Sequence, residues 1–211
     1  MNVNEIHVHK TALLFFDMLN VYYHGAIPEK KEAMRPAIEN AVRLRDAAGR
    51  ASIPVMFAQA NHRPDGATNN SVITETDMRL RPWPNSEFVV KGHAATAGSW
   101  EAEIIEELKP APEDTVVPKY RWNAFYQTYL DLALRSRGID TVILSGGSIE
   151  IGIASTAYAA RDMDYNVIVV RDACTASREE TLDIWMDKIF PRLARVRTTI
   201  QVLEMMEKEL V

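Results

Sequence analysis

Cysteine is nearly absent from this sequence, which has 211 residues and a single cysteine, Cys174. One cysteine excludes an internal disulfide, a cysteine-rich zinc site and a paired-cysteine redox motif. The sequence also lacks an apolar run long enough to span a bilayer. Segment 1–10 is polar and has no signal-peptide core. We therefore expect a cytoplasmic protein.

An excess of positive charge is also missing. The chain has 24 Lys and Arg residues against 29 Asp and Glu residues, a formal net charge of −5. Proteins that bind nucleic acid or anionic membranes usually carry a basic surface, so neither partner is expected. The 47% of hydrophobic residues can form a substantial core, which predicts one soluble domain over residues 1–211.

Apolar strand patterns alternate along the chain with helix patterns. Each strand pattern is a continuous apolar run, which is typical of a mostly parallel sheet covered by helices on both faces. We therefore predict an α/β fold with a sheet of five to six strands. The expected strands cover residues 10–16, 53–58, 114–118, 141–144, 166–170 and 196–200. The expected helices cover 29–50, 99–108, 125–137 (ended by Gly138), 151–161, a segment from a capping box at 177–180 to about 190, and 202–210.

Polar residues follow several of these expected strands. Asp17, Gln59 and Lys119 each stand at a strand end, and segment 146–152 follows another. Each residue taken alone is more commonly a turn, cap or solvated surface residue. In a parallel sheet, however, ligands bind beyond the carboxyl ends of the strands. Their common position therefore predicts one site at this edge.

Segment 143–157 is the centre of that predicted site. It passes from a buried strand through Gly146 and Gly147 into an alanine-rich helix. Such a turn presents backbone N–H groups and a helix N-terminus to a ligand. A nucleophilic side chain would be expected on this elbow, but position 152 is a glycine. A second candidate feature is the polar segment 61–93, which contains a short apolar piece at 88–90 and is predicted to be a functional loop or flap.

Three separated motifs resemble those of the isochorismatase-like hydrolase superfamily, also called the cysteine hydrolase superfamily. The first is Leu-Leu-Phe-Phe-Asp-Met-Leu-Asn around Asp17. The second is Val-Pro-Lys-Tyr-Arg-Trp-Asn-Ala-Phe around Lys119, and the third is Gly-Gly-Ser-Ile-Glu-Ile-Gly-Ile-Ala-Ser-Thr, which includes Gly152. The resemblance covers the whole chain. It implies a Rossmann-like three-layer α/β/α sandwich and a homo-oligomer, a dimer or tetramer.

The resemblance also shows a departure from the amidase branch of this superfamily. In that branch the elbow carries a cysteine nucleophile activated by the aspartate and the lysine, whereas the matching position here is Gly152. A threonine common in the elbow is replaced by Ile149. Cys174 follows a different strand, and a lone cysteine is usually a small buried side chain. We therefore expect no thiol chemistry.

Isochorismatases resemble this sequence in having glycine at the elbow. The resemblance implies that Asp17 is a carboxylic acid that protonates a vinyl-ether carbon, after which water adds to the resulting cation. Lys119 would position the acid and a carboxylate of the ligand. Gln59 matches a substrate-binding glutamine of that branch. The remaining expected substrate-binding residues are Tyr22, Arg121, Gly147, Ser148, Ile151 and Gly152.

The resemblance further implies a cis peptide bond at Gly147–Ser148. With no side chain at position 152, we expect the N–H groups of Ile151 and Gly152 to face the ligand at the start of a helix. Nicotinamidase-like members carry an Asp-x-His metal motif, but the matching aspartate is Ala60 here, which leaves a lone His62. We therefore expect no catalytic metal and no cofactor.

Two other functions stay open at this point. The chain could be a catalytically silent protein that binds a small molecule, although a buried Asp17–Lys119 pair is costly to keep without use. It could also be an amidase that uses another nucleophile or an activated water. The preferred interpretation is a hydrolase that acts on a small anionic molecule by acid–base chemistry of Asp17 and Lys119.

Overall fold

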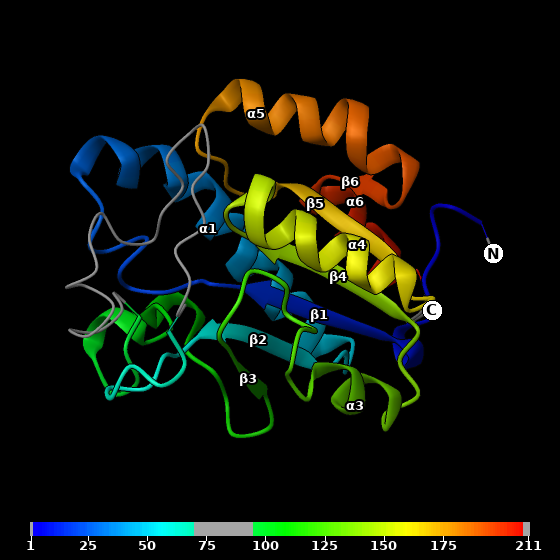
Figure 1. Cartoon of the computed structure of the whole chain (residues 1–211). Coiled ribbons are helices and arrows are strands. Elements are labelled where there is room, and N and C mark those ends of the chain that lie inside the picture. The colour runs from blue at the N-terminus through cyan, green and yellow to red at the C-terminus, as the bar shows by residue number, and fades with distance from the viewer. Residues whose placement is uncertain (1, 70–94, 209–211) are drawn as a thin grey trace.

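A computed structural model describes residues 2–69 and 95–208, and its core is one parallel sheet (Figure 1). Six strands lie in the order β3-β2-β1-β4-β5-β6, and every neighbouring pair is parallel. Their bounds are β1 Thr11–Phe16, β2 Val55–Ala60, β3 Thr115–Lys119, β4 Thr141–Gly146, β5 Asn166–Cys174 and β6 Arg195–Arg197. The strand number and direction confirm the predicted mostly parallel sheet.

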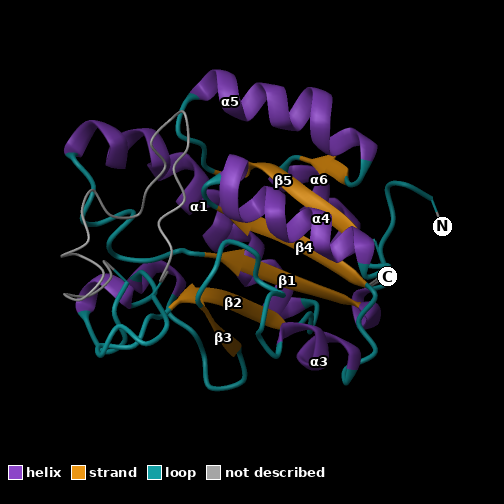
Figure 2. Ribbon diagram, in the orientation of Figure 1, coloured by secondary structure: helices purple, strands orange, loops and turns teal. Residues whose placement is uncertain are grey.

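Helices cover both faces of the sheet, as Figure 2 shows. On one face lie α1 (Pro28–Arg50) and α6 (Thr199–Glu207), and on the other lie α3 (Leu130–Arg135) and α4 (Ala154–Asp162). Successive side chains of a strand point to opposite faces. In β1, Leu13 therefore packs in the core under α1, whereas Leu14 packs in the core under α3 and α4. This double burial explains the continuous apolar strand patterns, and the α/β/α sandwich is confirmed.

The carboxyl-terminal part departs from the sequence prediction. The expected strand 196–200 is shorter, because β6 ends at Arg197 and Ile200 already lies in α6. The capping box that starts α6 is formed by Thr198 and Gln201, which exchange side-chain and backbone hydrogen bonds. The capping box expected at residues 177–180 is wrong. There the N-cap of α5 (Glu179–Ile184) is Arg178, which makes no capping bond, and the N–H of Ser177 donates to Glu150.

Two expected helices are also shorter or broken. The segment 99–108 forms two 3₁₀ turns, Trp100–Ala102 and Glu106–Leu108. The backbone between them bonds to the segment after β1 instead, since Ile105 N–H donates to Met18 and Asn20 N–H donates to Glu103. The helix expected over 125–137 covers only α3, because Gln127 has a left-handed backbone (φ 54°) that cannot continue a helix.

Other parts of the prediction are either confirmed or untested. α3 is followed by Gly138 with φ 69°, as expected from the glycine signal. The predicted flap over 61–93, with its apolar piece at 88–90, lies mostly outside the described residues. None of the helices in the described part of the chain is long and apolar enough to cross a membrane.

Candidate active site

A cavity of about 690 Å³ opens beyond the carboxyl ends of β1, β3, β4 and β5. Parallel strands place their carboxyl ends at one edge, and a cavity at that edge is the usual ligand site of an open α/β sheet. Its wall brings together residues that are far apart in the sequence, including Asp17, Lys119, Ser148, Gly152 and Thr175. The cavity lies where the sequence predicts a site.

Asp17 is the first residue after β1, and its side chain is held in place at both carboxylate oxygens. Its backbone takes the left-handed conformation (φ 49°), which turns the chain sharply at the strand end. Oδ1 accepts a hydrogen bond from the N–H of Ala60 at 2.8 Å, and Oδ2 accepts one from Lys119 Nζ at 2.7 Å. The side chain is 9% exposed, so the carboxylate is nearly removed from water but satisfied by two donors.

Lys119 is the last residue of β3, and only 4% of its surface is exposed. Because β3 and β1 lie on either side of β2, the long lysine side chain reaches across to Asp17. Its Nζ also lies 3.5 Å from the carbonyl oxygen of Arg121 and 4.3 Å from the centre of the Phe16 ring. The predicted meeting of Asp17 and Lys119 in one pocket is confirmed.

The elbow after β4 begins with two glycines, Gly146 and Gly147, that lie very close to neighbouring chain segments. A Cβ on Gly146, which has φ 125°, would lie 2.2 Å from the carbonyl oxygen of Phe16. A Cβ on Gly147 would lie 2.0 Å from Thr175 Oγ1. The Gly147–Ser148 peptide bond is cis, as predicted. Gly146 is therefore required by its positive φ and its close approach to the backbone of β1, whereas Gly147 packs against the side chain of Thr175.

The N–H groups of the elbow do not face the cavity as free donors, so that prediction is wrong. Residues Ile149–Ile153 form a π-helical turn that leads into α4. Within it, the carbonyl oxygen of Ser148 accepts hydrogen bonds from Ile151 N at 3.3 Å and Gly152 N at 3.1 Å. Each donor is thus used inside the turn, although Gly147, Ser148, Ile151 and Gly152 all line the cavity.

Gly152 lies directly against the ring of Phe16. A Cβ at position 152 would be 2.0 Å from Phe16 Cε1 and 2.3 Å from Cζ, much closer than atoms can pack. The same ring lies beneath Lys119 Nζ. Phe16 therefore fills the space between the elbow and the lysine, and the sequence alone gave no signal of this packing.

Tyr22 also lines the cavity and contributes an aromatic surface near Asp17, while its expected contact with substrate stays a prediction. Desolvation of its phenol and the negative charge of Asp17 both raise the pKa of Tyr22. The hydroxyl therefore stays protonated over the ordinary pH range and can donate a hydrogen bond to a ligand.

Gln59 and Arg121 do not belong to the cavity wall in this structure. The amide of Gln59 donates to the carbonyl oxygen of Ala102 at 2.7 Å. The guanidinium of Arg121 is exposed and donates to the carbonyl oxygens of Thr68 and Tyr120. Both side chains instead bind neighbouring loops, and their expected contact with substrate stays a prediction.

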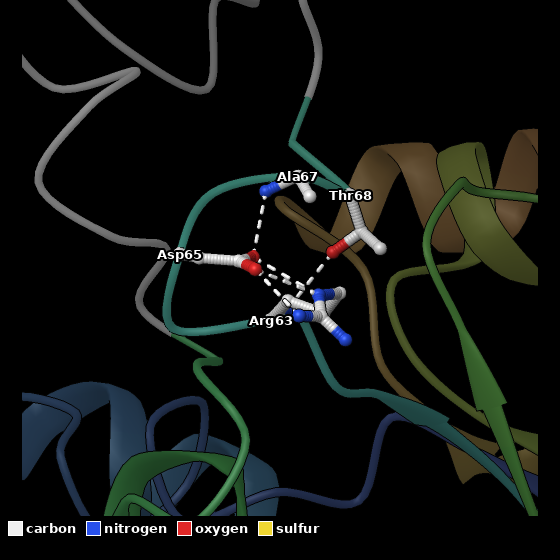
Figure 3. Close-up of polar contacts among 4 residues, drawn as sticks. All are labelled: Arg63, Asp65, Ala67 and Thr68. Carbon is white, nitrogen blue, oxygen red and sulfur yellow. Dashed lines mark hydrogen bonds and ion pairs between the residues drawn. The ribbon is translucent and has the colours of Figure 1, made fainter.

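The loop that Arg121 contacts is a compact turn after β2 (Figure 3). Arg63 forms an ion pair with Asp65 at 2.5 Å, and Asp65 Oδ1 accepts a hydrogen bond from Ala67 N. The N–H of Arg63 donates to Thr68 Oγ1 at 2.9 Å. These local bonds hold the loop that the Arg121 guanidinium contacts at the carbonyl oxygen of Thr68.

Three charged residues on the cavity wall were not singled out from the sequence: Lys30, Glu150 and Arg178. Glu150 lies on the elbow, where its Oε1 accepts a hydrogen bond from Ser177 N at 3.0 Å. Arg178 follows β5, so the same attention to strand ends that selected Asp17 could have found it. Lys30 lies in the first turn of α1, and no strand-end signal marks it.

Cys174 and His62 lie outside the cavity wall. Burial raises the pKa of the Cys174 thiol to about 12, so the reactive thiolate is strongly disfavoured. Burial likewise lowers the pKa of His62 to about 4, which keeps its imidazole neutral. Across residues 2–69 and 95–208, no group of three or more His, Cys, Asp or Glu side chains is arranged to hold a metal ion.

Comparison with known proteins gives a consistent result. A family model described as "Isochorismatase domain" matches residues 11–201. The chain is 32% identical over 204 residues to the uncharacterized isochorismatase family protein YwoC of Bacillus subtilis. This match covers 97% of this chain and 98% of that protein. It is 34% identical over 179 residues to the ureidoacrylate amidohydrolase RutB of Methylorubrum extorquens, with 77% of this chain and 68% of that protein covered.

Among solved structures, the chain is similar to an isochorismatase family protein from Burkholderia thailandensis. The TM-score is 0.79 at 30% sequence identity, and the match covers 96% of this chain and 98% of the other. The similarity thus extends over nearly the whole length of both chains.

Proposed function

The chain belongs to the isochorismatase family, and from this premise we propose that it is a hydrolase that acts on a small anionic molecule without a cysteine nucleophile. The observation that carries the proposal is the buried ion pair of Asp17 and Lys119 on the cavity wall. Burying two charges is costly, and replacement by apolar residues is often neutral or stabilising. A pair kept at a cavity therefore favours a chemical role over a silent binding protein.

The elbow supports chemistry without a nucleophilic side chain. Gly152 stands where the amidase branch, by the resemblance of the motif, carries its cysteine, and the Phe16 ring occupies the adjoining space. Cys174 is the buried last residue of β5 and does not line the cavity. The reaction that we propose therefore proceeds by proton transfer and direct attack of water.

Vinyl-ether hydrolysis fits these requirements best. Asp17 gives a proton to the terminal vinyl carbon, which leaves an oxocarbenium ion. Water adds to the cationic carbon, and the resulting hemiketal loses its alcohol to leave a carbonyl compound. Lys119 holds the substrate carboxylate beside Asp17.

Amide hydrolysis by an activated water is the second candidate. It is favoured by the 34% identity with a ureidoacrylate amidohydrolase. It is also favoured by the ion pair itself, because a carboxylate beside an ammonium can accept a proton from water. In this reaction Asp17 acts as a base toward the attacking water, and Lys119 stabilises the negative charge that develops on the amide oxygen.

A hydrolysis screen tests both candidates. We would assay vinyl ethers, amides and ureides that carry a carboxylate, using the wild-type chain, Asp17→Asn and Cys174→Ala. Asp17→Asn keeps the shape of the side chain but cannot transfer the proton, so turnover should fall by about 10²–10⁴-fold. Cys174→Ala is the matched control and should retain activity.

The substrate class that turns over decides between the two reactions. Equal turnover by wild type and Asp17→Asn, or loss of turnover in Cys174→Ala with the fold retained, would contradict the proposed chemistry. Absence of turnover in every class, together with tight binding of one of the compounds, would favour the silent binding protein.

A further inference from the structure

The cavity has two unlike walls. One wall comes from the elbow and the segment after β5, and it presents the polar residues Ser148, Thr175, Ser177 and Thr181. The other comes from the segment after β1 and from α1, and it presents Met18, Tyr23, Met34 and Ile38, with Lys30 about one helical turn before Met34. The elbow packs in one core cluster, and the segment after β1 and α1 pack in the other, so the cavity lies between elements from opposite faces of the sheet.

The cavity is also longer than the acid–base pair requires. Asp17 follows β1 and Thr175 follows β5, and β4 lies between these two strands. Since neighbouring strands are about 4.8 Å apart, the cavity extends roughly 10 Å along the sheet edge from Asp17. Its volume of about 690 Å³ lies within the range of sites for drug-sized ligands. A two- or three-carbon acid would leave most of it empty.

Apolar surface that faces a water-filled cavity gains free energy when a ligand covers it. On the α1 side, Met18, Tyr23 and Ile38 are buried among the core residues, and Met34 is half-buried against them. None of these four side chains supplies a charge, and methionine adapts its shape to the group packed against it. This wall therefore has the composition of a binding surface for an apolar group.

We propose that Met18, Tyr23, Met34 and Ile38 form an apolar subsite that binds a ring-sized or branched aliphatic part of the substrate. The reacting group lies at Asp17 and Lys119, and the polar edge of the substrate faces Ser148 and the segment after β5. The inference rests on the proposed function and narrows its substrate class to amphipathic acids with an apolar body. A small ureido acid, polar along its whole length, does not use this subsite.

Binding of two homologous ligand series tests the subsite without requiring turnover. We would titrate straight-chain carboxylates from propionate to octanoate, with phenylacetate added, and the matching primary amides, by calorimetry or NMR. Burial of one methylene contributes about 0.8 kcal/mol, which is about fourfold in affinity. In the wild type, affinity should rise by about this factor for each added methylene until the subsite is filled.

Met34→Ser should reduce the gain per methylene and weaken the longest ligands by about tenfold, because it places a polar hydroxyl on the apolar wall. Met34 is preferred to the fully buried residues because its half-buried side chain can be shortened with less risk to the fold. Leu132→Ser is the matched control. Leu132 is 69% exposed on α3 and does not line the cavity, so this variant should bind like the wild type.

The two series separate the subsite from the proposed function. A chain-length gain in the amides without binding of the acids would support the subsite and contradict the anionic substrate. A gain in both series that Met34→Ser removes supports both proposals. Affinities that do not change with chain length, an unchanged gain in Met34→Ser, or no binding up to millimolar concentration would each overturn the apolar subsite.

Discussion

Two regions of the cavity wall near the proposed chemistry differ in how they are built: the ends of β1 and β3, and the end of β4. At the ends of β1 and β3, two charged side chains meet, and both oxygens of Asp17 have donors. At the end of β4, the wall contains Gly147 and Gly152 beside the side chains of Ser148, Glu150 and Ile151, and the N–H groups of Ile151 and Gly152 are used inside their own turn. The first region thus presents a buried ion pair, whereas the second presents glycines packed against neighbouring chain segments.

Phe16 connects these two regions. Its ring lies 4.3 Å from Lys119 Nζ and fills the space beside Gly152. The aromatic face stabilises the ammonium on one side, and the ring edge excludes a side chain at the elbow on the other. The comparison shows that a residue without a side chain at one strand end, Gly152, packs against a large side chain, Phe16, at the end of the neighbouring strand.

The largest expected effect comes from breaking the charged region. Lys119→Ala leaves the Asp17 carboxylate buried without its partner, so the free energy of unfolding should fall by about 3–5 kcal/mol and turnover should be lost. Urea denaturation measures the stability. The elbow control Ser148→Ala should change stability by less than about 0.5 kcal/mol, since its hydroxyl makes no hydrogen bond with the described residues. Similar losses in both variants would refute the contrast between the regions.

A cysteine introduced at the elbow tests the coupling through Phe16. Gly152→Cys forces the Phe16 ring to move, and such overpacking should cost about 1–3 kcal/mol. In the double variant Phe16→Val, Gly152→Cys, the smaller valine gives the new side chain room. The double variant should therefore be more stable than the sum of the two single changes predicts, by about 0.5–3 kcal/mol, in a double-mutant cycle measured by denaturation. Additive losses would show that the two positions are independent.

A pH-dependent effect concerns the neutral histidine beside the charged region. Burial is the main cause that lowers the pKa of His62 from 6.5 to about 4, and the positive charge of Lys119 adds to this shift. Between pH 6.5 and 4 the unfolded chain binds a proton that the folded chain does not. Stability should therefore fall as the pH falls through this window. Melting temperatures of the wild type and His62→Gln over this pH range measure the loss of stability. The difference between the two melting temperatures should shrink toward low pH. Melting temperatures that change in parallel with pH would argue against a buried neutral His62.

The fold was largely predictable because its signals are local and redundant. Continuous apolar strands such as 141–144 require burial on both faces, and alternation with helix patterns then implies a parallel sheet. The errors lie where tertiary contacts override local preference. Segment 99–108 has a helix pattern, but its backbone bonds to Met18 and Asn20 instead. The capping box expected at Ser177 is absent because its N–H donates to Glu150.

Part of the site could be predicted because the sheet is parallel. Strand ends share one edge of a parallel sheet, so the meeting of Asp17 and Lys119 follows from topology. The directions of Gln59 and Arg121 do not follow from it, because each side chain binds a carbonyl oxygen of a neighbouring loop. The apolar wall was not predicted either, since Met34 and Ile38 belong to the core-facing stripe of α1, and a helix pattern cannot distinguish a core contact from a cavity wall.

The sequence by itself determined the α/β class, the parallel sheet and the edge at which its polar residues gather. These properties depend on which residues are apolar and in what order the strands occur. Only the tertiary structure decided that the elbow amides are used internally, that Phe16 fills the space beside Gly152, and that the cavity has one polar and one apolar wall. The physical reason is that these features depend on distances between side chains on different elements, and no local pattern in the sequence encodes those distances.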